Sequence, residues 1–285
     1  MPQAKASFVD PRALAQHRKR ARPNDARFLI DVARFELQER LEDVNRTFTN
    51  PALIAPFPAL WDGFLPRARH VAPRDVLSLE PGAHDVVVHA MALHWADDPV
   101  GQIVQCRHAL QPDGLFLGVC LGGETLHELR ASLGQAEAET TGGMSPRVAP
   151  MAEIRDLGQV LQRAGLTLPV ADTVRQVASY SDIPSLARDL RAMGETNALA
   201  ARLNQPSSRA LFTRAAQLYA QHFPSGSGRI AATFDLMFLA GWRQHDSQQQ
   251  PMRPGSAGTR LADALNTAEF DETGAPVLDR TRNKK

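Results

Sequence analysis

One run of seven residues, Asp85 to Met91, constrains the fold more than any other part of this chain. It places three consecutive valines in a stretch that is apolar at nearly every position rather than at alternate ones. Such runs are typical of strands buried on both faces, as in parallel sheets. A helix predicted from Pro99 and a second apolar run at 115–121 follow at once. Together these segments match the size of one strand–helix–strand unit, roughly 30 residues or more. The sequence therefore predicts an α/β fold.

The remaining segments predict how the chain is organised around that unit. Residues 1–46 predict an N-terminal helical segment, because apolar residues recur there near helical spacing. Residues 47–242 predict the α/β domain, whose second half is rich in helix-forming segments. From 243 to 285 the chain is polar, with consecutive glutamines, and predicts a tail without fixed structure.

A first group of candidate site residues ends and follows the strand at 85–91. Ligands of α/β proteins bind at the carboxyl ends of parallel strands. The candidates at that end are Ala90, Met91, Leu93, His94 and Trp95. Trp95 has a second interpretation, as a cap on the hydrophobic core. Histidines at positions 84, 89 and 94 are spaced by five, which aligns them on neither a strand face nor a helix face. No metal site is predicted from them.

A second group of candidates follows the next strand, at the same edge of the sheet. Gly122 and Gly123 allow a sharp turn or a close approach of the backbone to a ligand. Glu124 either contacts a cation or a substrate base, or lies in the first turn of a helix, where acidic residues are favoured. Further along, Arg191 and Glu195 belong to a polar stretch. That stretch either lines a substrate cleft or forms an ordinary helix end.

The first predicted strand, 52–55, ends differently from the first strand of a nucleotide-binding domain. A dinucleotide-type loop needs glycine there, because the backbone must turn tightly and approach the ligand. Here Pro56, Phe57 and Pro58 take that place, and no glycine occurs before Gly63. Prolines have no backbone N–H to offer a ligand. We expect Phe57 to fill the space where a cofactor would approach.

Composition narrows the classes of partner. The chain carries 32 basic and 31 acidic side chains, and this balance gives no general case for nucleic acid or an acidic membrane surface. A basic cluster at 18–22 either contacts an acidic partner or forms a solvated helix face. No apolar run approaches the ~20 residues of a membrane span, so none is predicted. Two cysteines, Cys106 and Cys120, make no disulfide framework, and we expect a cytoplasmic location.

Several motifs together resemble the class I S-adenosylmethionine-dependent methyltransferases. The stretch 85–95 is similar to the fourth strand of the biotin-synthesis (malonyl carrier protein methyltransferase) type, and 110–116 to the turn into its fifth strand. A more specific set resembles the methyltransferase-like assembly factors of respiratory complex I and their bacterial relatives. That set comprises 122–130 (GGETLHELR), 142–147 (GGMSPR), 156–158, 163–165 and 189–197.

The resemblance implies a truncated Rossmann-like sheet with flanking helices and a helical substrate-side region. Truncation is expected because only residues 56–84 separate the first strand from the strand at 85–91, which leaves room for about one crossover. It implies S-adenosylmethionine as the cofactor, held at the end of that strand, with the second group of candidates facing a substrate or partner. Two functions follow from it. One is a methyltransferase-like protein with an unknown acceptor and a degenerate cofactor site. The other is a non-catalytic assembly factor, a pseudoenzyme that binds a protein client such as a complex I subunit.

Overall fold

The computed structural model describes residues 7–248 and residue 267. Two compact units divide the chain, residues 1–246 and 247–285, and every helix and strand named below belongs to the first. Most of the predicted tail, 243–285, lies outside the described residues. Among the helices of residues 7–248, none carries an apolar stretch that would reach across a bilayer.

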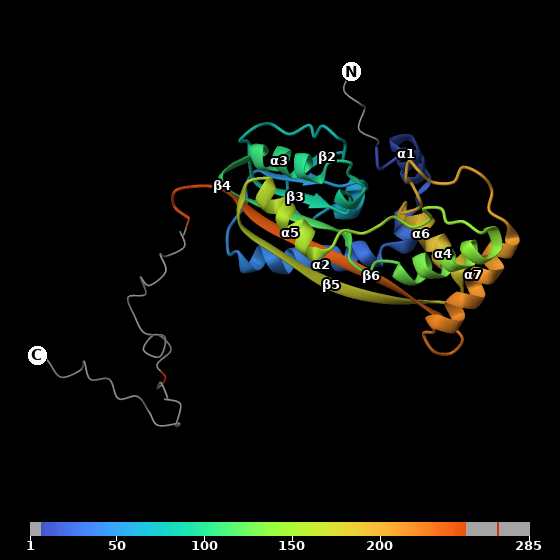
Figure 1. Cartoon of the computed structure of the whole chain (residues 1–285). Coiled ribbons are helices and arrows are strands. Elements are labelled where there is room, and N and C mark those ends of the chain that lie inside the picture. The colour runs from blue at the N-terminus through green and yellow to red at the C-terminus, as the bar shows by residue number, and fades with distance from the viewer. Residues whose placement is uncertain (1–6, 249–266, 268–285) are drawn as a thin grey trace, which may run out of the picture. The chain divides into compact units, whose positions relative to one another are not determined.

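Six strands form one mixed sheet in the order β2-β1-β3-β4-β6-β5 (Figure 1). Strands β2, β1, β3 and β4 are parallel, whereas β6 runs antiparallel to both β4 and β5. The strands are β1 (Pro51–Ile54), β2 (Arg69–Val71), β3 (His84–Ala90), β4 (Leu110–Gly122), β5 (Leu166–Tyr180) and β6 (Ile230–Arg243). The residues predicted as a turn at 111–114 instead form an irregular stretch inside β4, where its register against β3 shifts and Asp113 has φ +61°.

Helices cover both faces of this sheet. They are α1 (Pro11–Arg20), α2 (Phe28–Asp43), α3 (Pro99–Ala109), α4 (His127–Thr141), α5 (Ile154–Arg163), α6 (Ile183–Met193) and α7 (Arg209–His222), with short 3-10 turns η1 (Pro23–Ala26), η2 (Pro58–Trp61) and η3 (Leu93–Trp95). Residues of α2, α4, α6 and α7 pack on one face, and residues of α3 and α5 on the other (Figure 1).

The β-branched run of β3 explains this two-sided packing. Val86 and Val88 belong to the core on the α2 side, while Val87 belongs to the core on the α3 side. All three are fully buried. The prediction of a strand buried on both faces is therefore confirmed, together with the α/β fold class.

The sheet is short at the β2 edge. A doubly wound sheet of order 3-2-1-4-5-6 carries two strands beyond its first strand. Here β1 is followed on that side only by the three residues of β2. The predicted truncation of the Rossmann-like sheet is confirmed, and the missing strand is the one that would lie beyond β2.

The N-terminal segment lies across the loops that follow the parallel strands. Val9 forms an isolated bridge with Leu199, and the Asp97 carboxylate accepts the backbone N–H groups of Phe8 and Val9. Asp10 caps α1 by accepting the N–H groups of its first turn. Helix α1 is thus fixed close to the residues that follow β3, where the candidate ligand site was predicted.

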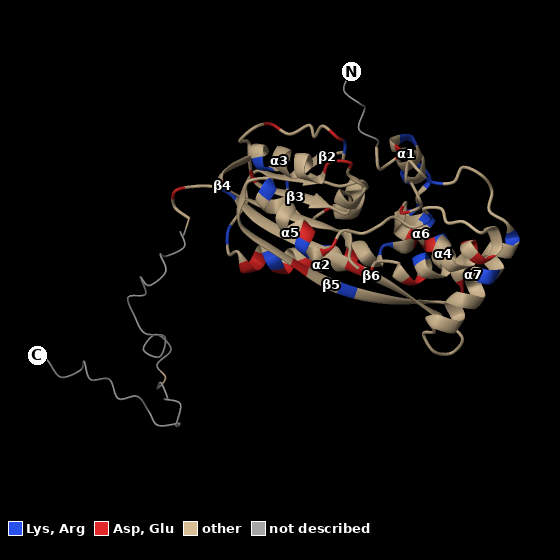
Figure 2. Cartoon of the chain, viewed as in Figure 1, with Lys and Arg blue, Asp and Glu red and all other residues tan. Residues whose placement is uncertain are grey.

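Charged side chains show no one-sided distribution. Figure 2 shows Lys and Arg interspersed with Asp and Glu along the helices of the first unit. This pattern agrees with the formal net charge of +1, and any charged binding surface must therefore be local.

Candidate functional site

The five residues predicted at the end of β3 do not share one environment. Ala90 and Leu93 are core residues, on opposite faces of the sheet. Met91 has φ +51°, and its N–H donates to the carbonyl of Val119 at 2.7 Å. Only His94 and Trp95 carry polar groups that reach another functional side chain.

His94 and Trp95 both bind the carboxylate of Glu195. The Nε2 atom of His94 lies 3.0 Å from Glu195 Oε2, and the indole N–H of Trp95 donates to the same oxygen at 2.5 Å. On the other side of the ring, the backbone N–H of Leu121 points at His94 Nδ1 at 3.4 Å. That contact places the ring proton on Nε2, facing Glu195. The three side chains tie η3 to the end of α6, and we refer to them as the Glu195 clamp.

Local chain geometry brings Glu195 into this position. Helix α6 ends at Gly194, which has φ +79° and is the left-handed C-cap residue that glycine adopts without strain. The N–H of Glu195 then donates to the carbonyl of Leu190, which fixes the turn. The interpretation of this stretch as a helix end is confirmed, and the same turn also delivers Glu195 to the site.

Electrostatics keep the Glu195 carboxyl ionised. Burial raises its pKa, but the His94 ring, the Arg18 guanidinium and the Trp95 N–H outweigh burial and hold the pKa below its ordinary value. Arg18 comes from α1, and burial lowers its own pKa. Its Nε and Nη2 atoms are buried and have no hydrogen-bond partner among the described residues. The Arg18 guanidinium therefore lies near Glu195 with donors available to an anion.

The space at the end of β1 is nearly filled on the side that faces α2. A hollow of only about 20 Å³ remains there, lined by Pro56, Phe57, Trp61, Met91, Met193 and Glu195 among others. That volume is close to the roughly 10–15 Å³ that one water needs. The ring of Phe57 reaches α6, where a side chain on Gly194 would meet its Cζ atom at 3.2 Å. Phe57 is thus one of the residues that narrow this hollow, and its identity with the cofactor position stays a prediction.

A larger cleft lies beside the closed hollow and shares Pro56 with it. Its volume is about 360 Å³, and its walls include residues that follow β1, β2 and β3 and the inner side of α1. Ligand sites span roughly 300–1,000 Å³, so a small molecule fits by size. Some of its polar groups are already engaged: Asp97 accepts from the N-terminal segment, and Gln102 binds the ring of His89 at 2.7 Å.

A third hollow, which we name the clamp pocket, unites the two predicted groups of residues. It measures about 150 Å³ and is lined by both rings and the carboxylate of the Glu195 clamp and by Arg191. Residues of α4, α6, the 147–151 loop and Phe234 complete it. Four of the ten predicted site residues thus meet in one place, between the end of β3 and the end of α6.

Gly122 and Gly123 lie against β6, and their contacts explain why both are glycine. A Cβ atom on Gly122 would meet Met237 Cγ at 2.5 Å, and one on Gly123 would meet Asp235 Oδ2 at 2.7 Å. Gly123 also has φ +52°. The close approach allowed by this glycine pair is made to the chain itself.

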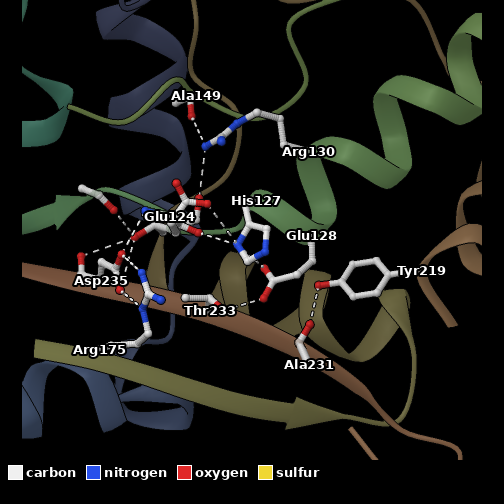
Figure 3. A network of polar contacts seen from close by, with 12 residues as sticks. Glu124, His127, Glu128, Arg130, Ala149, Arg175, Tyr219, Ala231, Thr233 and Asp235 are labelled. Carbon is white, nitrogen blue, oxygen red and sulfur yellow. Dashed lines mark hydrogen bonds and ion pairs between the residues drawn. The ribbon is translucent and has the colours of Figure 1, made fainter. Parts of the chain in front are cut away.

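Figure 3 shows the polar network that follows the glycine pair. Asp235 is buried, accepts the backbone N–H of Glu124 at 2.9 Å and pairs with both Nε and Nη2 of Arg175 at 2.7 and 2.8 Å. The pKa of Asp235 is lowered, chiefly because of Arg175. The Glu124 side chain is half exposed and lies 3.8 Å from the ring of His127. It precedes α4 and lies outside its first turn, so the second interpretation of Glu124 is wrong in that detail.

Three functional residues were missed or undervalued from the sequence. Arg147 lines the clamp pocket, and Glu137 holds it through a two-point ion pair of 2.7 and 3.0 Å. The pKa of Glu137 is lowered to about 2 by Arg147 and Ser145. Asp75, four residues after β2, lines the 360 Å³ cleft. No periodic pattern marks Arg147 or Asp75, because both lie in loops, whereas Glu137 lies in α4. Among residues 7–248, no cluster of three or more potential metal ligands occurs.

The chain has homologues among two named groups of proteins. It is 35% identical over 193 residues to the arginine-hydroxylase NDUFAF5, mitochondrial, of Danio rerio, covering 68% of this chain and 60% of that protein. The mouse protein of the same name is 37% identical over 198 residues, covering 68% and 56%. A malonyl-[acyl-carrier protein] O-methyltransferase of Laribacter hongkongensis is 31% identical over 172 residues, covering 60% and 55%. The resemblance read from the motifs is confirmed.

The chain spans about 55–60% of the length of these curated relatives. No model of a protein family matches it. Among solved structures, it is similar to an S-adenosylmethionine-dependent methyltransferase of Thermotoga maritima at 11% identity, covering 77% of this chain and 97% of that one, with a TM-score of 0.36. It is also similar to a phosphoethanolamine N-methyltransferase of Haemonchus contortus at 12% identity, covering 63% and 38%, with a TM-score of 0.34.

Proposed function

We propose that this methyltransferase-like chain acts as a non-catalytic, client-binding assembly factor. The observation that carries the proposal is the hollow beside Phe57 on the α2 side of the β1 end, where only about 20 Å³ remains. Methyl transfer depends on holding the sulfonium methyl in line with its acceptor. Pro56 and Pro58 offer no backbone N–H for that purpose. The residues at this end do not fit S-adenosylmethionine, and we derive no chemical step through it there.

The clamp pocket, in the part of the molecule predicted to face a substrate, also supports client binding. The Glu195 clamp and the Glu137–Arg147 pair are buried and hold the clamp pocket open at about 150 Å³. A buried carboxylate that loses its hydrogen-bond donors, or a buried ion pair that loses one partner, is strongly destabilised, so these contacts give the pocket a fixed shape. A fixed pocket without a cofactor loop suits recognition of another protein. The resemblance of the motifs at 122–130 and 142–147 to the complex I assembly factors suggests a respiratory complex I subunit as that client.

S-adenosylmethionine-dependent methyl transfer is the second candidate, and one observation favours it. The 360 Å³ cleft has the size of a ligand site and carries Asp75 after β2, where a carboxylate can accept ribose hydroxyls. In this alternative the cofactor lies beside Trp95 rather than at Phe57. The acceptor is then a group that enters from the clamp pocket, which shares Trp95 with the cleft.

Isothermal titration with S-adenosylmethionine and S-adenosylhomocysteine separates the two candidates. The client-binding proposal expects no heat of binding up to millimolar ligand. A micromolar affinity that weakens at least about tenfold in Asp75→Asn would establish the second candidate and refute the first. Asp85→Asn is the matched control, because Asp85 lies at the opposite end of β3 and caps residues 49–50.

We propose a cytoplasmic location for the same chain. Cys106 and Cys120 are both free and buried, which suits a reducing compartment. The NDUFAF5 relatives are named as mitochondrial, so cell fractionation with an antibody against the chain is the direct test. Recovery of the chain in a membrane-enclosed or secreted fraction would refute this location.

A further inference from the structure

A long groove separates α6 from α7 on the helical side of the molecule. Its volume is about 800 Å³. On α7 the inner stripe is buried in the core, and it comprises Leu211, Ala215, Leu218 and Tyr219. The outer stripe that lines the groove includes Phe212, Ala216 and Ala220, spaced by four so that they share one helix face.

Helix α6 supplies the facing wall in the same way. Its buried residues are Ile183, Leu186, Leu190 and Met193. The groove is lined by Pro184, Ala187 and Arg191, which follow helical spacing along the outward side. Each helix therefore uses one face for the core and leaves a second, mostly apolar face open toward the other helix.

Phe212 is the most conspicuous side chain of the groove. It lies in the first turn of α7 and is 46% exposed. A large aromatic ring that lies exposed between small alanines is the kind of anchor that binding surfaces use. Scattered exposed apolar residues need no explanation, but one set in a continuous apolar groove indicates a contact surface.

The charge at the groove has one sign. Arg191 and Arg209 line it, at the end of α6 and the start of α7, and none of its lining residues is acidic. Within the part of the chain that the structure describes, neither arginine has an ion-pair partner. Both side chains are exposed. An acidic partner would therefore gain two charge-assisted contacts without breaking an existing pair.

The groove is continuous with the clamp pocket. Ala187 and Arg191 line both hollows. A partner lying in the groove therefore has one of its side chains within reach of the Glu195 clamp.

We propose that the α6–α7 groove binds an amphipathic helix of a client protein, with the client's apolar face on Phe212 and its acidic residues on Arg191 and Arg209. This inference rests on the proposed client-binding function and names the surface that performs it. Two helices with open apolar faces present a trough for a third helix, the common helix-in-groove mode of recognition. An extended peptide would instead seek a sheet edge, where its backbone hydrogen bonds are satisfied.

Two fluorescein-labelled peptides of about 16 residues test the groove by fluorescence anisotropy. Both carry leucine at helical spacing on one face; one has glutamate on the flanks of that face and the other has lysine. The full chain is expected to bind the glutamate peptide at least about tenfold more tightly than the lysine peptide. Added salt is expected to narrow this preference, because exposed charges are screened.

Matched variants assign the binding to the groove. Phe212→Asp and Arg209→Glu are each expected to weaken binding of the glutamate peptide about tenfold. Phe35→Asp is the control for the first, since Phe35 is also an exposed ring within a helix, α2. Arg155→Glu is the control for the second, since both arginines lie in the first turn of a helix. Circular dichroism of all four variants is the check that each of them folds.

Three results would overturn the proposal. Equal affinity for both peptides would refute the role of Arg191 and Arg209. If the control variants weaken binding of the glutamate peptide as much as the groove variants do, the groove is not the binding site. A dimer in light scattering that dissociates in Phe212→Asp would show that a second copy of the chain covers the surface. These results are independent of the S-adenosylmethionine titration. Binding of S-adenosylmethionine would not prevent binding of the glutamate peptide. If the chain binds neither S-adenosylmethionine nor the glutamate peptide, only the proposal for the α6–α7 groove is refuted.

Discussion

Replacing Phe57 with alanine tests whether the ring is what closes the space at the end of β1. A fully buried phenylalanine costs about 3–5 kcal/mol when it is truncated to alanine. Phe57 is partly buried and packs against the core on the α2 side. We therefore expect a loss of about 2 kcal/mol in the free energy of unfolding. For a domain of this size, that loss corresponds to a fall of roughly 4–8 °C in Tm.

Urea unfolding followed by tryptophan fluorescence measures this loss, because Trp61 lines the same hollow. Phe35→Ala is the control: its ring is 63% exposed, and a change within about 0.5 kcal/mol is expected. If Phe57→Ala also falls within about 0.5 kcal/mol of the unmodified chain, the ring does not fill the hollow. The argument for a closed cofactor position would then fail.

A double-mutant cycle with Gly194 adds a more specific test of the same contact. In Gly194→Ala the new methyl lies 3.2 Å from Phe57 Cζ and 3.3 Å from Ala21 Cβ, at a residue with φ +79°. The left-handed backbone alone costs alanine about 1–2 kcal/mol. Removing the Phe57 ring relieves the steric part, so the two effects are expected to be less than additive by at least about 0.5 kcal/mol. Strict additivity would place Phe57 away from α6.

Three further predictions concern other parts of the fold. The pKa of Glu137, lowered to about 2 beside Arg147, implies stability that is present above the unfolded pKa near 4.5 and is lost as pH falls toward 2; the loss is at most about 3 kcal/mol. Glu137→Gln should flatten this acid limb in urea midpoints taken at pH 7 and pH 3, and an unchanged limb would contradict it. Asp235→Ala leaves the N–H of Glu124 and the Arg175 guanidinium without their acceptor, so a loss of about 3 kcal/mol is expected in urea unfolding; a loss below about 1 kcal/mol would show that the network is dispensable. Burial raises the pKa of both thiols, that of Cys120 to about 12, so Ellman's reagent should react with neither in the native state and with both in urea; rapid native labelling would refute their burial.

Elements with a strong local pattern could be predicted from the sequence. The valine run of β3 and the apolar run of β4 are buried on both faces, so nearly every position in them is apolar. Helix α6 begins at Asp182, which caps it, and ends at Gly194, a left-handed residue. In each case the signal lies within a few residues of the structure that it predicts.

Contacts between distant segments could not be predicted in this way. Phe57 meets Gly194, and Gly123 meets Asp235, across long separations in the sequence. A glycine signals that something approaches the backbone, but the sequence does not say whether that is a ligand or the chain itself. For this reason the sequence left open whether Gly122 and Gly123 make a sharp turn or approach a ligand, and the structure places them against β6. Asp75 escaped notice because the loop around it has no periodicity.

The positions of the glycines and of the buried charges lead to one consistent picture of the molecule. After β1, where a cofactor loop would have glycine, the chain has two prolines and Phe57. The glycine occurs instead at Gly194, which faces the ring of Phe57. The buried Glu195 carboxylate, held by the His94 and Trp95 rings, and Arg147, held by Glu137, line the clamp pocket. Such contacts lose more from disruption than they gain in net stability over apolar packing, so their value lies in holding one geometry. The narrow hollow beside Phe57 and the fixed geometry of the clamp pocket are the two features on which the proposed entry of a client from the α6–α7 side rests.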